Sequence, residues 1–369
     1  MHNKIVTQHM ESPFIYNTHV AYTNFLGRKD ELTTLKTHIL NRENTLLYGG
    51  PGTGKDSLIL NTITEVKKTI PNIVICTIDM SNIRKLHEIA IELIAQIDNS
   101  FPEADLNKTA YYAIKKLIET NSDLEPNRYI ELFETIDSIE NISNNILIIY
   151  FKDFQHILLS DNPEFELRLL EKAFSKNYNT TYIITGNEVN AMKFIFEKKK
   201  YFYKFAYKIT LSPIERRLFV DYISKCFLKV GRVIERTYCE KIYDLFNGHP
   251  YYVIQLASIC FELTVGYFGD KILAHALDNI IAIHESYFKY MINNLSNYQL
   301  SFLKAINDGH DLFSSSDIIS RYGLNSSANV FRVKEALCKK EIITFNDDDK
   351  PEIIDPLFRY WLKNIYFRY

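Results

Sequence analysis

Nine residues, Gly49-Gly50-Pro51-Gly52-Thr53-Gly54-Lys55-Asp56-Ser57, separate an apolar run at 45–48 from a stretch of helical apolar spacing at 58–63. A strand, a glycine loop and a helix in this order predict a phosphate-binding loop. The glycines let several backbone N–H groups point at one anion, the helix adds its positive dipole end, and Lys55 adds a full charge. The alternative is a glycine-rich turn that only joins strand to helix. The G-x-x-x-x-G-K spacing and both flanking elements favour phosphate binding.

One position of this loop departs from the pattern. After the lysine the pattern expects Ser or Thr, whose hydroxyl holds Mg²⁺, but the chain has Asp56 there. Ser57 comes one residue too late, because one step along a helix rotates a side chain by roughly 100°. The Asp56 carboxylate can ligate a metal, yet it also brings negative charge beside the phosphates. The loop therefore predicts nucleotide binding and leaves hydrolysis open.

Composition narrows the class of protein. The 369 residues have room for two or three domains, and the formal charge of −2 gives no global attraction to nucleic acid or to an anionic membrane surface. The five cysteines are scattered without a C-x-x-C pair, which is typical of reduced thiols in an intracellular protein. Without a signal pattern or an apolar run near ~18 residues, we expect a cytoplasmic protein with no membrane partner.

Residues 24–212 alternate between apolar strand-like runs and helical spacing. Such alternation predicts a parallel sheet covered on both faces, with ligands at the carboxyl ends of the strands. The expected strands are 45–48, 73–78, 146–151, 181–185 and a short 208–211. The expected helices are 32–39, 58–63, 83–97, 106–120, 128–139 and 164–174.

The remaining chain predicts two further domains after an N-terminal arm at 1–23. Residues 213–294 have helical spacing throughout (214–228, 237–246, 251–263 and onward from 271), which predicts a helical lid. Residues 295–369 predict helices at 297–307, 315–321 and 326–340 and a hairpin of 342–345 with 352–354. Gly323 ends the middle helix, and Asn325 or Ser326 caps the next. Three helices and a β-wing describe a winged helix-turn-helix.

Several further motifs occur together in this chain. They are Phe25-Leu26-Gly27-Arg28, Ile184-Thr185-Gly186-Asn187, Leu211-Ser212-Pro213, Gly248-His249-Pro250-Tyr251-Tyr252 and Asp355-Pro356-Leu357-Phe358-Arg359-Tyr360-Trp361-Leu362. With the glycine loop, they make the chain resemble the archaeal-type ATPase family, relatives of the origin-recognition/Cdc6 and STAND branches of AAA+ P-loop proteins. The resemblance implies an α/β P-loop NTPase core that binds ATP or ADP, a helical lid and a C-terminal winged helix. It implies phosphate contacts from the loop. It also implies that Phe25, Leu26 and Arg28, with Gly248, His249 and Pro250, flank the base and ribose, and that Asn187 belongs to the nucleotide site.

The central strand departs from the family pattern. Relatives carry an acidic pair followed by Phe-Gln, where this chain has Lys152-Asp153-Phe154-Gln155. By the resemblance, Lys152 stands in place of the Mg²⁺-orienting aspartate, and Asp153 stands in place of the water-activating glutamate. The segment before Leu211 also lacks the usual arginine that stabilises the transferring phosphoryl group.

Asp56 and Lys152 therefore occupy two positions that the family places around one metal. We hypothesise that the two side chains pair, with the ammonium where Mg²⁺ normally lies. Opposite charges about 4 Å apart gain roughly 4 kcal/mol at an effective dielectric near 20, against the cost of desolvating both. Hydrolysis is then slow or absent. In one alternative Asp153 still helps to hold Mg²⁺ and turnover continues at a low rate; in another Lys152 points to solvent and Asp56 ligates the metal alone.

Three other features have a structural and a functional interpretation. Lys198-Lys199-Lys200 with the aromatic residues at 201–203 is either a nucleic-acid contact or, as we expect, a solvated helix end beside core aromatics. His249 shapes the nucleotide turn and has no visible carboxylate to orient it as a base. Asp355-Pro356 makes a turn before an apolar terminal helix.

The predicted winged helix carries no clear basic surface. Residues 295–369 contain ten Lys or Arg and ten Asp or Glu, and the wing tip Asp347-Asp348-Asp349 is acidic where DNA-binding wings approach phosphate. The third helix offers Arg332, Lys334, Lys339 and Lys340 but also Glu335. We expect a protein-contact or intramolecular role for this domain rather than DNA binding.

These predictions combine into an ATP- or ADP-binding AAA+/STAND-like regulatory protein with a protein partner. The nucleotide sets the arrangement of core, lid and winged helix, and hydrolysis is weak or lost. Two alternatives remain open: a DNA-binding factor of the origin-recognition type, and a Mg²⁺-dependent ATPase with Asp153 as the catalytic residue.

Overall fold

The computed structural model describes residues 12–20, 24–101, 108–122, 124–143, 145–346 and 348–368. The chain divides into two compact units, each treated by itself below. The α/β unit comprises Arg28–Pro51 and Leu58–Ser212. The C-terminal unit comprises Met1–Gly27, Gly52–Ser57 and Pro213–Tyr369. The boundary between the units therefore crosses the glycine loop, after Pro51 and again after Ser57.

The α/β unit is built on a five-stranded sheet of order β2-β3-β4-β1-β5, in which every neighbouring pair is parallel. Its strands are β1 (Thr45–Tyr48), β2 (Ile73–Asp79), β3 (Ile146–Lys152), β4 (Thr181–Gly186) and β5 (Tyr207–Lys208). β3 lies between β2 and β4 and is buried from Leu147 to Phe151. A continuous apolar run such as this is what a strand needs when both faces of its sheet are covered.

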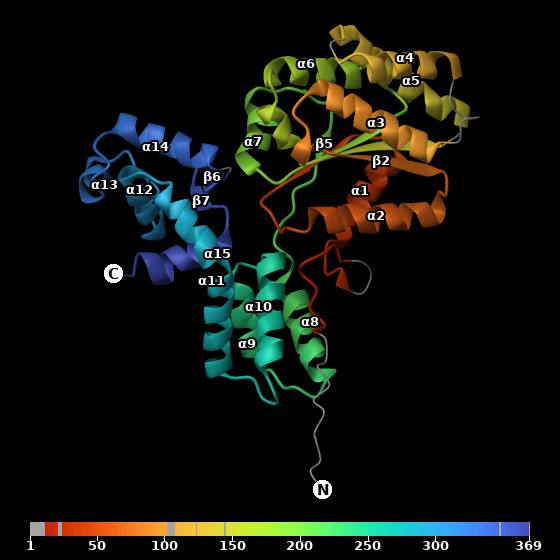
Figure 1. Ribbon diagram of the computed structural model, residues 1–369. Helices are drawn as coiled ribbons and strands as arrows, with labels where there is room; N and C mark the ends of the chain where they lie inside the picture. Colours follow the sequence, from red (N-terminus) through yellow and green to blue (C-terminus); the bar gives the residue numbers. More distant parts are fainter. Residues whose placement is uncertain are drawn as a thin grey trace. The chain divides into compact units, whose positions relative to one another are not determined.

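Helices cover both faces of this sheet, with α1 and α2 on one side and α3, α4 and α5 on the other (Figure 1). The helices are α1 (Lys29–Leu40), α2 (Lys55–Thr69), α3 (Leu86–Ser100), α4 (Lys108–Thr120), α5 (Pro126–Ser143), α6 (Pro163–Phe174) and α7 (Val189–Lys193). Short helical turns are η2 (Met80–Asn82), η4 (Phe154–Leu159) and η5 (Phe194–Lys198). Leu147, Ile149 and Phe151 of β3 share one apolar cluster with α3 to α6, as the two-residue period of a strand requires.

The C-terminal unit contains the helical lid and the winged helix. Its helices are α8 (Arg216–Leu228), α9 (Arg236–Leu245), α10 (Pro250–Leu263), α11 (Asp270–Asn293), α12 (Asn297–Asn307), α13 (Ser316–Arg321), α14 (Ser327–Lys339), α15 (Pro356–Trp361) and η6 (Leu362–Tyr366). The wing is an antiparallel pair, β6 (Ile343–Phe345) and β7 (Pro351–Ile353). Gly323 has φ 62°, and the Ser326 hydroxyl caps α14 by accepting from the N–H of Asn329 at 3.2 Å.

One hydrophobic core runs through the lid and the winged helix. Phe288 of α11 packs against Phe358 and Trp361 of α15, with ring centroids 5.3 and 5.7 Å apart. Phe14 of the N-terminal arm is 3% exposed in the same core, where its ring contacts those of Phe227 and Phe261. The arm and both predicted domains are thus packed together in the C-terminal unit.

The sheet edge and the segment after β4 differ from the sequence predictions. The strand predicted at 208–211 is only Tyr207–Lys208, because it is an edge strand whose register with β1 covers two residues. The helical residues 189–198 were not predicted, since their apolar spacing is short and irregular. The predicted starts of the helices at 83 and 315 move to Leu86 and Ser316. Residues 1–11 and 21–23 of the arm, the start of the helix predicted at 106–120, and Asp347 lie outside the described residues.

Candidate nucleotide-binding site

The glycine loop connects β1 to α2 as the sequence predicts. Its first residue stays attached to the sheet, because the N–H of Gly49 donates to the carbonyl oxygen of Gly186 at 3.3 Å. Its last residues begin α2, a helix of 15 residues. The Lys55 side chain is 4% exposed, and its ammonium donates to the Thr53 hydroxyl at 3.2 Å. A buried ammonium at a helix N-terminus next to glycines is the arrangement that binds phosphate.

The middle of the loop packs against the turn that starts α10. Gly52 has φ 72°, and its carbonyl oxygen accepts from the N–H of Tyr251 at 3.3 Å. A Cβ atom on Gly52 would lie 2.7 Å from the Cβ of Tyr251 and 3.0 Å from Cε1 of His249. Both the backbone conformation and the close approach therefore require glycine here. The structure thus brings together two predicted elements, the loop and the Gly248-His249-Pro250 turn, in which His249 is the N-cap of α10.

The end of the loop contacts the N-terminal arm. The hydroxyl of Ser57 accepts from the backbone N–H of Val20 at 3.2 Å, and Ser57 is 8% exposed. Asp56 lies in the first turn of α2. The contact between Val20 and Ser57 could not be predicted from residue types, because it joins a backbone amide to a residue 37 positions away.

Charged residues meet at the carboxyl ends of β2 and β3. Asp79 and Lys152 are register partners, with the Lys152 ammonium 3.8 Å from Oδ2 of Asp79. The Asp79 side chain is 51% exposed and that of Lys152 is 29% exposed. Burial acts to raise the pKa of Asp79, but hydrogen bonds from Ser81 and the charges of Lys152 and His156 outweigh it, so that this pKa lies below its usual value. Sequence reasoning missed Asp79 as a site residue, although it directly follows the apolar run of β2.

The ends of β3 and β4 meet next to this pair. The side-chain amide of Asn187 donates to the Asp153 carboxylate, and the backbone N–H of Asn187 donates to Oε1 of Gln155 at 3.2 Å. Asp153 is 9% exposed and has φ 54°. The predicted residues Asp153 and Asn187 thus lie together. Lys152 and Asp56 belong to different units, so their predicted ion pair stays a prediction.

The predicted base-flanking segment spans another boundary between the units, after Gly27. Leu26 packs against the core of the C-terminal unit, and Phe25 is half-buried. Arg28 is the N-cap of α1 in the α/β unit, where its guanidinium donates to Oε1 of Glu31 at 2.8 Å and to the carbonyl oxygen of Ser212. The motif at 25–28 is therefore divided between the two units, like the glycine loop.

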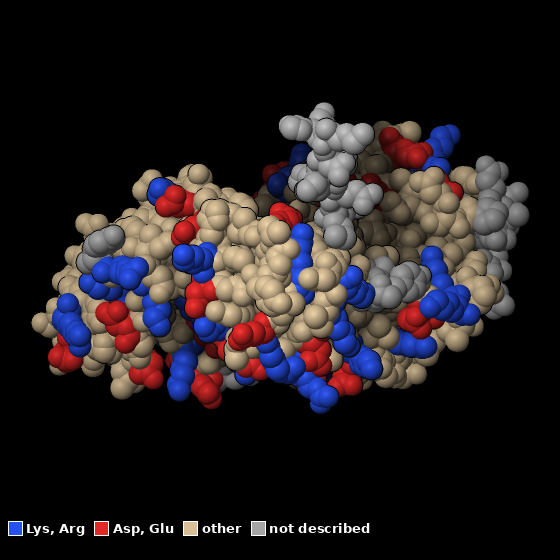
Figure 2. Space-filling model, turned by 90° about the horizontal axis from the view of Figure 1, so that it is seen from below, with Lys and Arg blue, Asp and Glu red and all other residues tan. Residues whose placement is uncertain are grey.

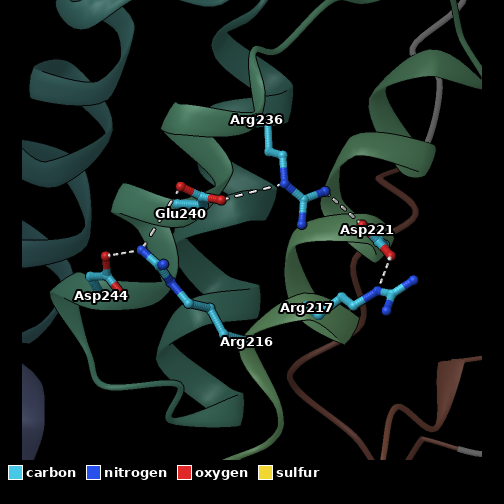
Figure 3. Close-up of polar contacts among 6 residues, drawn as sticks. All are labelled: Arg216, Arg217, Asp221, Arg236, Glu240 and Asp244. Carbon is cyan, nitrogen blue, oxygen red and sulfur yellow. Dashed lines mark hydrogen bonds and ion pairs between the residues drawn. The ribbon is translucent and has the colours of Figure 1, made fainter.

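Three lid arginines are held in a network of ion pairs between α8 and α9 (Figure 3). Arg236 lies 2.9 Å from Asp221 and 3.4 Å from Glu240, while Arg216 lies 2.5 Å from Asp244. Arg217 completes the network at 3.8 Å from Asp221. The hydrogen bond from Arg236 holds the pKa of Asp221 below its usual value. The network ties the two lid helices to each other.

The basic stretch at 198–200 and the cysteines were also singled out in the sequence. Lys198, Lys199 and Lys200 are exposed, while Tyr201 and Phe202 are buried, which agrees with a solvated helix end beside core aromatics. Cys338 is half-buried, and the other four cysteines are buried. In the described part of the chain, no cluster of three or more His, Cys, Asp or Glu side chains could hold a metal. No helix within that same part is long and apolar enough to cross a membrane.

Comparison with known proteins identifies the fold. A family model described as a probable winged helix domain matches residues 286–364. A Walker-type ATPase of Pyrococcus abyssi is similar over 95% of this chain and 99% of its own, with a TM-score of 0.68 and 18% identity. The ORC2 protein of Aeropyrum pernix is similar over 91% of this chain and 93% of its own, with a TM-score of 0.58 and 14% identity. The chain has a P-loop ATPase fold with a C-terminal winged helix. No curated protein sequence matches it.

The fold class predicted from the sequence is therefore confirmed, and so is the resemblance at the level of the fold. The order β2-β3-β4-β1-β5 places the glycine loop after a strand inside the sheet, next to the end of β4. The ends of β1, β2, β3 and β4 all lie at one edge of the parallel sheet, where ligands of such sheets bind.

Proposed function

We propose that the protein binds ATP or ADP at the loop from Gly49 to Ser57 and acts as a nucleotide-controlled regulatory protein. Support comes from the buried Lys55, the glycine loop and the N-terminus of α2, which together suit a polyphosphate. The ORC2 structures of similar fold are described as ADP and ADPNP–ADP complexes, which also favours an adenine nucleotide. The proposed site further includes Phe25, Leu26, Arg28, Asn187 and the turn Gly248-His249-Pro250.

Hydrolysis is proposed to be weak or lost, and the observation that carries this is the position of Lys152. Lys152 is the last residue of β3, and its ammonium lies 3.8 Å from Asp79. By the family resemblance, this is the position at which a P-loop ATPase carries a metal-orienting carboxylate. The neighbouring Asp153 carboxylate accepts a hydrogen bond from the side-chain amide of Asn187. Mg²⁺ prefers carboxylate and water oxygens, and a cation at the strand end repels it. The residues at the end of β3 therefore do not fit a Mg²⁺ site.

The regulatory part of the proposal rests on the contacts of the loop. Gly52 and Ser57 form hydrogen bonds within the C-terminal unit, whereas Gly49 forms its hydrogen bond within the α/β unit. A nucleotide that orders the loop therefore acts on contacts of both units. Since the lid (213–294) and the winged helix (295–369) share one core, we propose that they respond together. A ligand shifts such an arrangement only through differential contacts with its states.

The direct test is nucleotide binding with and without Mg²⁺. We expect fluorescent ADP and ATP analogues to bind the purified protein in EDTA within about threefold of their affinity in Mg²⁺, since an ammonium replaces the ion. Phosphate release should not exceed that of a Lys55→Ala control. An affinity that falls steeply in EDTA rejects the Lys152 substitution, turnover above the control supports a Mg²⁺-dependent ATPase instead, and no binding in either condition rejects the proposal.

A protein partner remains the proposed target of the switch, and DNA is the second candidate because the winged helix matches a family model. Against DNA, the Lys334 ammonium lies 4.2 Å from the centre of the Phe345 ring and thus contacts the wing. Lys and Arg are interspersed with Asp and Glu on the face drawn in Figure 2. A gel shift with duplex DNA at low salt separates the two: a salt-sensitive complex that Arg332→Ala weakens supports DNA, and no shift supports a protein partner.

A further inference from the structure

The two sequence motifs at 248–252 and 355–362 meet in the structure. The hydroxyl of Tyr252 donates to Oδ2 of Asp355 at 2.7 Å, across 103 positions of sequence. Burial and the nearby Asp355 carboxylate both raise the pKa of Tyr252, so its hydroxyl stays protonated and remains a donor. The bond joins α10 of the lid to Asp355, the N-cap of α15.

Asp355 also holds the start of α15. Its other oxygen, Oδ1, accepts from the backbone N–H groups of Leu357 and Phe358 at 2.8 and 2.9 Å. One carboxylate therefore caps a helix with one oxygen and anchors that helix to the lid with the other. Charge-assisted bonds of this kind are stronger than neutral ones, and the cap depends on a side chain that Tyr252 helps to orient.

The start of α10, where Tyr252 lies, also contacts the phosphate loop. Its neighbour Tyr251 donates its backbone N–H to Gly52, and the rings of His249 and Tyr252 lie 5.0 Å apart. An added Cβ on Gly52 would lie only 2.7 Å from the Cβ of Tyr251, so the loop is packed closely against the start of α10. Well-packed groups of this kind transmit displacements instead of absorbing them.

We propose that the Tyr252–Asp355 hydrogen bond is a latch that couples the phosphate loop to the C-terminal helix α15. The coupling runs from Gly52 through the backbone of Tyr251 to the Tyr252 hydroxyl, and then to the carboxylate that caps α15. It rests on the proposed function, because the nucleotide is the ligand that changes the loop. The latch itself exists without nucleotide, and its effect on α15 is measurable in either state.

The test is hydrogen–deuterium exchange of the full chain with and without ADP, in the wild type and in Tyr252→Phe. Without nucleotide, Tyr252→Phe should speed the exchange of the α15 amides by about fivefold, the equivalent of one ordinary hydrogen bond. In the wild type ADP should change exchange at both the start of α10 and α15. In Tyr252→Phe the change at α10 should remain, and the change at α15 should be lost.

Tyr322→Phe is the matched control. Its hydroxyl donates to Oδ2 of Asp308, also at 2.7 Å, but both residues belong to the winged helix, and Tyr322 and Tyr252 are each 8% exposed. This variant should change exchange near α13 and leave the response of α15 to ADP intact. Asp355→Asn keeps an N-cap side chain, and combining it with Tyr252→Phe should add little to either single change.

The outcomes separate the latch from the proposed function. An α15 response to ADP that is equal in Tyr252→Phe and the wild type overturns the latch, and so does an equal loss in Tyr322→Phe. If ADP binds to none of the variants, the proposed function fails. The latch is then judged on exchange without nucleotide, where unchanged protection of α15 in Tyr252→Phe overturns it.

Discussion

The glycine loop and the carboxyl ends of β2 to β4 are two proposed parts of the nucleotide site, and they differ in what their side chains contact. The loop keeps the glycines and a buried Lys55 at the start of a helix, all suited to an anion. At the strand ends the polar and charged groups contact one another: the Lys152 ammonium pairs with Asp79, and the Asn187 amide donates to Asp153. We propose that the part that binds phosphate is retained while the part that supports metal chemistry has changed. Each prediction below tests one side of this difference.

The largest effect is expected from Lys55→Ala. Removing the ammonium should weaken ADP and ATP binding by about 100-fold, because hydrogen bonds to charged groups contribute roughly 1.5–3 kcal/mol. Lys68→Ala is the matched control on the same helix, where the ammonium is exposed and pairs with Glu65 at 2.8 Å. The affinities are measured by titration calorimetry. If Lys55→Ala and Lys68→Ala bind nucleotide with equal affinity, the loop is not the anion site, and the contrast between the loop and the strand ends is rejected.

The next effect is on stability and comes from Asn187→Ala. The buried Asp153 carboxylate loses the donated amide hydrogen, which should lower the free energy of unfolding by about 2 kcal/mol. Asn187→Asp should be worse, because it places a second carboxylate beside the first. Urea unfolding followed by circular dichroism measures both variants. If both variants are as stable as the wild type, the strand-end groups do not depend on each other.

The fold could be predicted from the sequence because its signals are local. The continuous apolar run of β3, the alternation of strands and helices, and the Ser326 cap all act over a few residues. The edge strand β5 was overpredicted because its length is set by pairing with β1, not by its own residues. The glycine loop was predictable for the same local reason, since its spacing alone indicates phosphate binding.

The contacts of the site were less predictable than its residues. Asp79 meets Lys152 only because β2 and β3 are neighbours in the sheet, an order that the sequence did not specify. The bond from Val20 to Ser57 involves a backbone N–H, which leaves no mark on residue type. Tyr252 and Asp355 lie in two motifs that were noticed separately, and their contact depends on how α15 packs on the lid.

A smaller effect is expected when the two substituted positions are returned to the family pattern. In Asp56→Ser combined with Lys152→Asp, nucleotide affinity should become Mg²⁺-dependent and fall about tenfold in EDTA, because a hydroxyl and a carboxylate are the ligands that Mg²⁺ prefers. The wild type should change by less than about threefold. Fluorescent nucleotide titrations with and without EDTA measure the difference. If the wild type already loses affinity in EDTA by the same factor, its strand ends support Mg²⁺ binding, and the proposed difference between the loop and the strand ends is rejected.

The smallest expected effect is the loss of stability when Asp79 is protonated at acid pH. The pKa of Asp79 in the folded protein is lowered below its ordinary value of 3.8, so its ionised form stabilises the fold at a pH above that value. This contribution is lost as the pH falls through the folded pKa, where the carboxylate takes up a proton and Lys152 loses its partner. Because half of the Asp79 side chain is exposed, solvent screens the pair and the effect is small.

Asp79→Asn is the variant that isolates this contribution. The difference in urea midpoint between the wild type and Asp79→Asn should stay constant at a pH well above 3.8 and disappear as the pH falls through the lowered pKa of the folded protein. Asp161→Asn serves as the control, since Asp161 pairs with Lys85 at 3.7 Å but its side chain is 77% exposed. A larger acid-dependent difference for Asp161→Asn than for Asp79→Asn would mean that the Lys152–Asp79 pair is an ordinary surface contact. Breaking the contact with Asp79 would then cost Lys152 little when a nucleotide binds.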